Sequence, residues 1–131
     1  MLIFAIASCG EDSPSDDQAR DLAVDYLEAY VSADPDLCDL ITSSERAAVE
    51  LLGTGTSEPR DCEQVIEESG TPLQAADIRR AAAAVRDAPL ARQDGYLAIR
   101  FVGPQFPNSL TLSLLFAEDE GEWKVDDLQL G

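Results

Sequence analysis

The hydrophobic positions of this chain change their spacing once, near its middle. Between residues 19 and 31, apolar side chains recur every three or four positions, and acidic side chains fall on the opposite side of the implied helix. Ser15 followed by Gln18 is typical of a capping box, which favours a helix start at this point. Asp34, followed by a proline, is expected to end the helix.

Shorter helices are expected to follow in the first half of the chain. Thr42 with Glu45 is a second capping-box pattern, and Gly70 is a stop signal. Glycine, serine and proline make residues 53–59 a loop. The expected helical segments are residues 37–41, 42–52 and 62–68.

The second half alternates apolar and polar residues with a period of two, which predicts strands. Residues 93–95 and 118–121 have the composition of hairpin turns. Residues 75–91 are ambiguous, because the alanines at 81–84 favour a helix whereas the turn at 93–95 requires a strand before it. We favour a strand ending near Ala91. The other predicted strands cover residues 96–102, 109–116 and 122–130.

This order of elements predicts an α+β domain over residues 18–131. All the helices are expected in the first half of the chain, packed on one face of a curved antiparallel sheet. A length of 131 residues fits a single domain with one core.

The charge of the chain excludes one class of partner. Its 9 basic and 26 acidic residues give a net charge of −17, so we expect no nucleic acid to bind. Residues 10–77 hold 18 of the acids and 3 of the bases. Mutual repulsion is therefore concentrated in the first half.

Residues 1–8 are uncharged and mostly apolar, and Ile6, Ala7 and Ser8 directly precede Cys9. This order resembles a bacterial lipobox, which implies cleavage after Ser8 and diacylglycerol on the Cys9 sulfur. The chain would then be attached to the membrane by lipid. Residues 1–8 are short for a secretory signal and lack its basic segment, so we interpret them as the remnant of a leader that starts upstream. Residues 9–17 are expected to form an acidic tether.

With Cys9 assigned to lipid, Cys38 and Cys62 form an even pair in an exported protein, for which we expect a disulfide. Two free buried thiols are the alternative. A metal site is disfavoured, because two cysteines in a chain without histidine make a poor zinc shell.

The domain resembles the nuclear transport factor 2-like, or cystatin-like, superfamily in the variant found in actinobacterial lipoproteins. The residues that carry the resemblance are the opening helix with Ala23, Tyr26, Leu27 and Tyr30, the break from Asp34-Pro35 to Cys38, the Cys38 and Cys62 pair, and the closing stretch of residues 121–128. In that closing stretch the resemblance implies that Trp123 and Val125 enter a cone-shaped sheet, while Lys124 and Asp126 point outward.

The same resemblance implies two possible functions for the space inside the curved sheet, a ligand cavity or an active site. Members of the superfamily commonly enclose an apolar cavity between the sheet and the first helix, although a solid core is the simpler interpretation here. Some members are isomerases or dehydratases, but we find no catalytic residue: an isomerase needs an inward carboxylate, and Asp21, Asp25 and Glu28 are expected to face outward. The residues expected to line a cavity are Tyr26, Tyr30, Leu97, Phe101, Leu112, Leu114 and Trp123.

Two charged patterns are interpreted as solvated surface. Acidic residues 118, 119, 120 and 122 lack the ligand spacing of a calcium loop. Five arginines could form a stripe on the open sheet face for an acidic partner, but we expect them to pair with the acidic half or to meet solvent. They are Arg79, Arg80, Arg86, Arg92 and Arg100.

The sequence therefore predicts a non-enzymatic module, without cofactor or metal, held by lipid on the outer side of the bacterial cell membrane. Its expected partner is an envelope protein or a small apolar ligand, and exposed apolar residues on the sheet would favour a homodimer. The alternative is a small superfamily enzyme, isomerase- or dehydratase-like, with a cavity between the first helix and the sheet.

Overall fold

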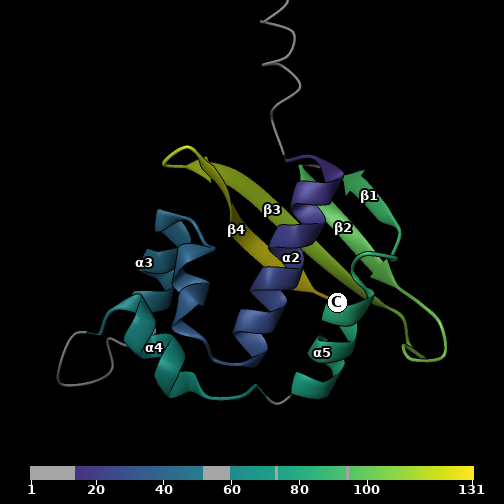
Figure 1. Cartoon of the computed structure of the whole chain (residues 1–131), viewed down its shortest axis with the longest axis horizontal. Helices are drawn as coiled ribbons and strands as arrows, with labels where there is room; N and C mark the ends of the chain where they lie inside the picture. The colour runs from purple at the N-terminus through teal and green to yellow at the C-terminus, as the bar shows by residue number, and fades with distance from the viewer. Residues whose placement is uncertain (1–13, 52–59, 73, 94) are drawn as a thin grey trace, which may run out of the picture.

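The computed structural model describes residues 14–51, 60–72, 74–93 and 95–131 (Figure 1). The predicted leader remnant 1–8, the lipidation residue Cys9 and the loop 53–59 lie outside the described residues. So does the tether up to residue 13.

The described chain is an α+β fold, as the sequence predicts: α-helices accompany a four-stranded antiparallel sheet in the order β1-β2-β3-β4. The helical elements are α2 (Asp16–Val31), the 3-10 helix η1 (Pro35–Asp39), α3 (Ser43–Leu51), α4 (Cys62–Ser69) and α5 (Ala75–Ala84), and the strands are β1 (Leu90–Gln93), β2 (Tyr96–Phe101), β3 (Leu110–Asp119) and β4 (Glu122–Leu130).

Helix α2 begins at the predicted capping box. The Ser15 hydroxyl oxygen accepts a hydrogen bond from the Gln18 backbone N–H at 3.2 Å, and the Ser15 N–H donates to the Gln18 side chain at 3.0 Å. Asp16 is thus already helical, and Pro14 before it is buried.

Helix α5 corrects the prediction that every helix lies in the first half, and it shows that most of the ambiguous segment 75–91 is helical. Ala75–Ala84 is helical, because a run of alanines favours the helix and presents none of the alternation that a strand requires. The strand that the hairpin requires is β1, which begins only at Leu90 and is four residues long. Arg20 of α2 donates to the carbonyl oxygens of Val85 and Ala88, just after α5 ends.

The sheet is a meander with one irregularity. Leu115 pairs with Asp127 and Phe116 pairs with Val125, so Asp126 is an extra residue in β4 that forms a β-bulge. The β3–β4 hairpin turns at Glu120 and Gly121, both of which have positive φ angles, as a two-residue turn of the I′ type requires.

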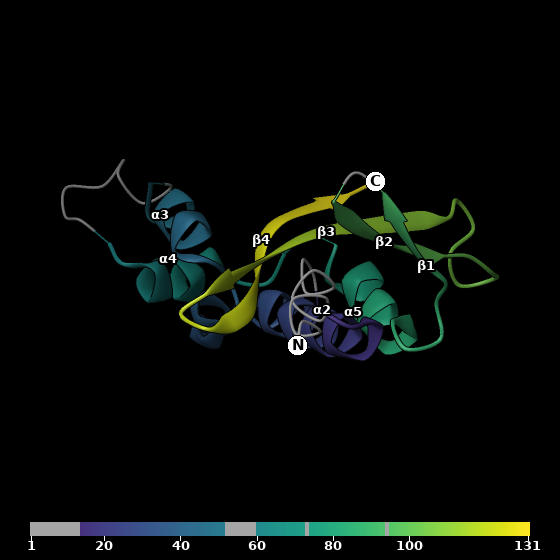
Figure 2. The same ribbon diagram turned by 90° about the horizontal axis from the view of Figure 1, so that it is seen from above.

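Helices α2 and α5 lie on one side of the sheet, and the core fills the space between these helices and the strands (Figure 2). Helices α2 and α5 run beneath the strands, while α3 and α4 form a group at one end of the molecule (Figures 1 and 2). The alternation of β2 and β3 decides which of their side chains enter the core, as the sequence predicts. Those that are at most 1% exposed are Leu97, Ile99, Phe101, Leu112 and Leu114.

The segment between η1 and α3 pairs with the outer edge of β4. The Thr42 N–H donates to the Val125 carbonyl at 3.0 Å, and the Val125 N–H donates to the Leu40 carbonyl at 2.9 Å. Ile41 is therefore in a parallel bridge with Val125. This pairing fixes the start of α3 against the sheet.

Candidate functional site

An open groove of about 610 Å³ lies where α2, α3, α5 and β4 approach one another. It combines aromatic, aliphatic and acidic side chains, which is the composition of many small-molecule sites. The residues that line it are Tyr26, Tyr30, Glu45, Pro72, Gln74, Ile78 and Leu128.

The two tyrosines are consecutive on one face of α2. Their rings are stacked, with centroids 6.3 Å apart and planes at 26°. Tyr30 is 42% exposed, which is high for a large hydrophobic side chain in this fold. Burial, followed by the negative charge of Glu45, raises the pKa of Tyr26 to about 12. At neutral pH the Tyr26 hydroxyl is therefore protonated and can donate a hydrogen bond.

Glu45 reaches the groove because the predicted capping box of α3 is only half formed. The Thr42 hydroxyl oxygen accepts the Glu45 backbone N–H at 3.2 Å. The return bond is absent, since the Thr42 N–H donates to Val125 in β4 instead. The Glu45 carboxylate is thus released from capping α3 and lines the groove. Partial burial, together with the charges of Asp127 and Asp126, raises its pKa above the ordinary range.

The bulge in β4 supplies the two neighbouring carboxylates. Asp126 accepts a hydrogen bond of 2.7 Å from the Thr42 hydroxyl. Asp127 accepts one of 2.7 Å from the Tyr96 hydroxyl, and this bond is the main cause of a raised Tyr96 pKa. The two hydroxyl groups that donate to Asp126 and Asp127 are neutral. Within the described part of the chain the ion pairs use other acids, namely Asp16, Asp21, Asp39, Glu63, Glu68 and Asp77.

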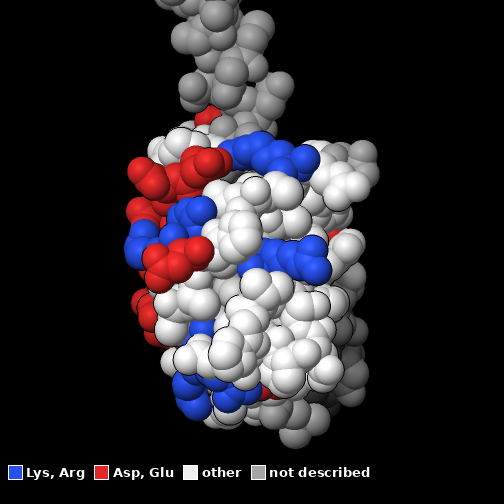
Figure 3. Space-filling model, turned by 90° about the vertical axis from the view of Figure 1, so that its right-hand side faces the viewer, with Lys and Arg blue, Asp and Glu red and all other residues white. Residues whose placement is uncertain are grey.

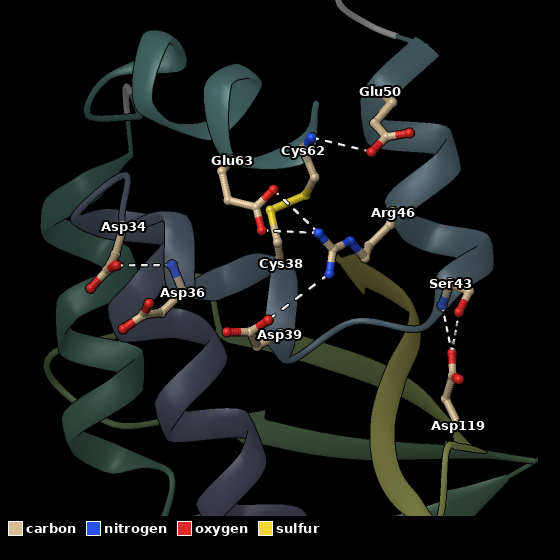
Figure 4. Close-up of polar contacts among 10 residues, drawn as sticks. All are labelled: Asp34, Asp36, Cys38, Asp39, Ser43, Arg46, Glu50, Cys62, Glu63 and Asp119. Carbon is tan, nitrogen blue, oxygen red and sulfur yellow. Dashed lines mark hydrogen bonds and ion pairs between the residues drawn. A yellow bond between two sulfur atoms is a disulfide. The ribbon is translucent and has the colours of Figure 1, made fainter. Parts of the chain in front are cut away.

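The start of α3, and with it Glu45, is held by a second set of contacts (Figure 4). Asp119 at the end of β3 accepts hydrogen bonds from the Ser43 backbone N–H at 2.6 Å and from its hydroxyl at 2.8 Å. These two bonds lower the pKa of the Asp119 carboxyl. A residue of the sheet, Asp119, thereby caps the N-terminus of α3.

The expected disulfide joins Cys38 in η1 to Cys62 in α4. Beside it, Arg46 of α3 donates to Glu63 at 2.9 Å and lies 3.9 Å from Asp39 (Figure 4). Three helical elements are therefore tied together by one covalent bond and one arginine.

The seven residues predicted to line a cavity fall into three places. Tyr26 and Tyr30 line the groove. Trp123 is half-buried and borders a second hollow near the start of α2, of about 390 Å³. Leu97, Phe101, Leu112 and Leu114 lie in the core.

Sequence reasoning missed most of the groove. The sequence indicates only a capping role for Glu45, and its spacing from Thr42 gives no sign that its side chain is free. Leu128 lies beyond the bulge, which changes the face of the sheet to which β4 residues point. Ile78 lies in α5, within the segment 75–91 that the sequence leaves ambiguous between helix and strand.

The five arginines are expected to pair with the acidic half of the chain or to meet solvent, and three of them form such pairs. Arg80 pairs with Asp77, Arg86 with Asp21 and Arg92 with Asp16, so three of the five meet acids of the helical layer. Figure 3 shows this side of the molecule, where basic and acidic side chains lie next to each other and much of the remaining surface is uncharged.

In the acidic hairpin of residues 118–122, Asp119 accepts the hydrogen bonds from Ser43 at the start of α3. Among the residues that the structure describes, no three acidic or cysteine side chains gather in a way that could hold a metal ion.

Comparison with protein-family models, with curated proteins and with solved structures gives no match. Within the described residues, the helices are too short or too polar to cross a membrane.

Proposed function

We propose that this chain is a non-enzymatic, lipid-anchored protein of the bacterial cell envelope, with a nuclear transport factor 2-like domain that binds a small ligand. The observation that carries the proposal is the groove, in which Tyr26, Ile78 and Leu128 offer apolar surface next to the hydrophobic core. The antiparallel sheet with α2 and α5 packed over one face supports the proposed fold. Anchoring through Cys9 rests on the lipobox.

Binding is tested by adding two neutral probes, indole and cyclohexanol, to the ¹⁵N-labelled chain and recording amide shifts by NMR. We expect shifts to cluster at the groove residues of α2, α5 and β4. Gln74→Trp, at an exposed groove position, should fill the opening and abolish them, whereas Gln93→Trp, exposed on β1, should leave them unchanged. Shifts confined to the open sheet face would instead favour an envelope protein partner or a homodimer.

Anchoring is tested by expressing the chain behind a lysine-bearing leader in a bacterium fed an alkyne fatty acid. We expect labelled protein in the membrane fraction. Cys9→Ser should abolish labelling, while Ser8→Ala keeps a small residue before the cysteine and should preserve it. Labelling of the Cys9→Ser variant would contradict the anchor.

A second candidate is an acid–base enzyme, favoured by one observation. Glu45, with a raised pKa, and Tyr26, with a protonated hydroxyl, line the same groove. A carboxylate base and a hydroxyl donor are what proton abstraction next to a carbonyl requires. Exchange of the acidic protons of cyclohex-3-enone for deuterium, catalysed by the chain and lost in Glu45→Gln, would establish this activity. Exchange at the uncatalysed rate would exclude it for this ketone.

A further inference from the structure

The groove carries negative charge that no basic residue offsets within the described part of the chain. Glu45 lines it, and the charges of Asp127 and Asp126 act on Glu45. Asp126 accepts a hydrogen bond from the Thr42 hydroxyl, and Asp127 accepts from the Tyr96 hydroxyl, the Leu128 backbone N–H and the Gln129 amide, all of which are neutral donors. Six other acids in the described chain do have ion-pair partners. An unpaired, partly buried carboxylate is costly, so a site that retains one favours a ligand that supplies the opposite charge.

On the basis of this charge and of the stacked tyrosines, we infer that the groove binds a small organic cation, a substituted ammonium group attached to an apolar body. The inference rests on the proposed binding function and adds the chemical class of the ligand.

The tyrosines favour an ammonium group. Tyr26 and Tyr30 present a stacked pair of rings to the groove, and the electron-rich face of an aromatic ring attracts cations. Alkylated ammonium ions suit such a site, because they lose less hydration on entry than a primary ammonium or a metal ion. The 42% exposure of Tyr30 in the free protein leaves that ring accessible.

The placement of the carboxylates disfavours a metal ion. A hard divalent cation needs several carboxylate oxygens in direct contact, and the described acidic residues form no such group. Glu45, Asp126 and Asp127 come from two different elements, and two of them are engaged by Thr42 and Tyr96. These carboxylates would therefore attract a ligand by long-range electrostatics rather than by direct coordination, which suits a bulky cation with a diffuse charge.

The rest of the groove accommodates an apolar body. Pro72, Ile78 and Leu128 also line it, and its volume of about 610 Å³ is in the range of pockets for small organic ligands. The raised pKa of Glu45 agrees with this assignment, because a bound cation would favour its ionised form. Binding should therefore weaken as the pH falls through that pKa.

The test compares choline with 3,3-dimethylbutan-1-ol, which has the same shape but carries carbon in place of the charged nitrogen. Both are titrated into the oxidised full chain, and affinities are taken from the amide shifts of groove residues. We expect choline to bind about tenfold more tightly than the neutral alcohol. Benzyltrimethylammonium, with a larger apolar body, should bind more tightly than choline.

Two variants test whether the preference for choline depends on the charge of Glu45. Glu45→Gln should weaken choline binding by about tenfold and leave the neutral alcohol unchanged. Glu67→Gln removes the same charge from an exposed position on α4 and should change neither affinity. A Glu45→Gln variant that keeps the full preference for choline would overturn the inference.

The two proposals fail in different ways. Equal binding of choline and the alcohol, or tighter binding of the alcohol, overturns the inferred charge of the ligand and leaves the binding groove supported. Groove amides that shift with none of the charged or neutral probes contradict both proposals.

Discussion

Thr42 connects the start of α3 to the sheet through its hydroxyl and its backbone N–H. It is 5% exposed, and its hydroxyl both accepts the Glu45 N–H and donates to Asp126. Its own N–H bonds to Val125. One residue thus decides where α3 begins and leaves the Glu45 side chain free for the groove.

Thr42→Val should lower the free energy of unfolding by about 1–2 kcal/mol, because it removes a helix cap and leaves Asp126 without its donor. Urea denaturation measures the change. Thr111→Val, the same substitution at a half-buried position of β3, should stay within about 0.5 kcal/mol of the parent. Equal effects of the two variants would show that the Thr42 contacts do not stabilise the fold.

Glu45 should make stability depend on pH in a definite direction. Its folded pKa is raised above its ordinary value near 4.5, so folding favours the protonated form, and stability falls as the pH rises through the window between the two values. Glu45→Gln should therefore be more stable than the parent at pH 7 and lose that advantage below about pH 4. Thermal unfolding at both pH values gives the comparison; a variant less stable at pH 7 would refute it.

At the scale of elements, the molecule has two differently stabilised parts. Helices α2 and α5 share an extensive apolar contact with the sheet, whereas α3 contributes no fully buried side chain. The group of η1, α3 and α4 depends on the disulfide, Arg46 and the Ser43 to Asp119 contact.

Replacing both Cys38 and Cys62 with alanine should lower the free energy of unfolding by about 3 kcal/mol, as expected for a loop of 24 residues. Amide hydrogen exchange should accelerate most in α3 and α4 and least in β2 and β3. Cys9→Ala serves as the control and should leave both measurements unchanged. Uniform acceleration across the sheet would contradict this division.

How far the sequence predicts these elements depends on how regular they are. The periods of α2, β2 and β3 place their buried side chains, because one face of each meets the core. The alanines of α5 show no such periodicity, and the bulge at Asp126 interrupts the alternation of β4. The groove escapes prediction because Glu45, Ile78 and Leu128 come together only through tertiary packing.

At the scale of the whole molecule, repulsion between acids acts against folding. The net charge of −17 is spread over a surface whose described ion pairs are largely exposed and so contribute little. Salt should screen the repulsion more than it weakens these pairs.

Raising sodium chloride from 10 to 300 mM at pH 7 should therefore increase the melting temperature by about 3 °C, equivalent to roughly 1 kcal/mol for a domain of this size. Potassium chloride should act in the same way, since the effect is one of ionic strength. A melting temperature that falls with salt would mean that the ion pairs outweigh the repulsion.

The segment at residues 40–42 has a consequence for self-association. By pairing with Val125 it occupies the middle of the β4 edge, so a strand from another molecule cannot add along that side. In the described chain, β1 is the edge that stays open, and it is only four residues long. Edge-to-edge association of folded chains is therefore expected at β1 rather than at the centre of β4, which would join chains in pairs and work against fibril-like polymerisation.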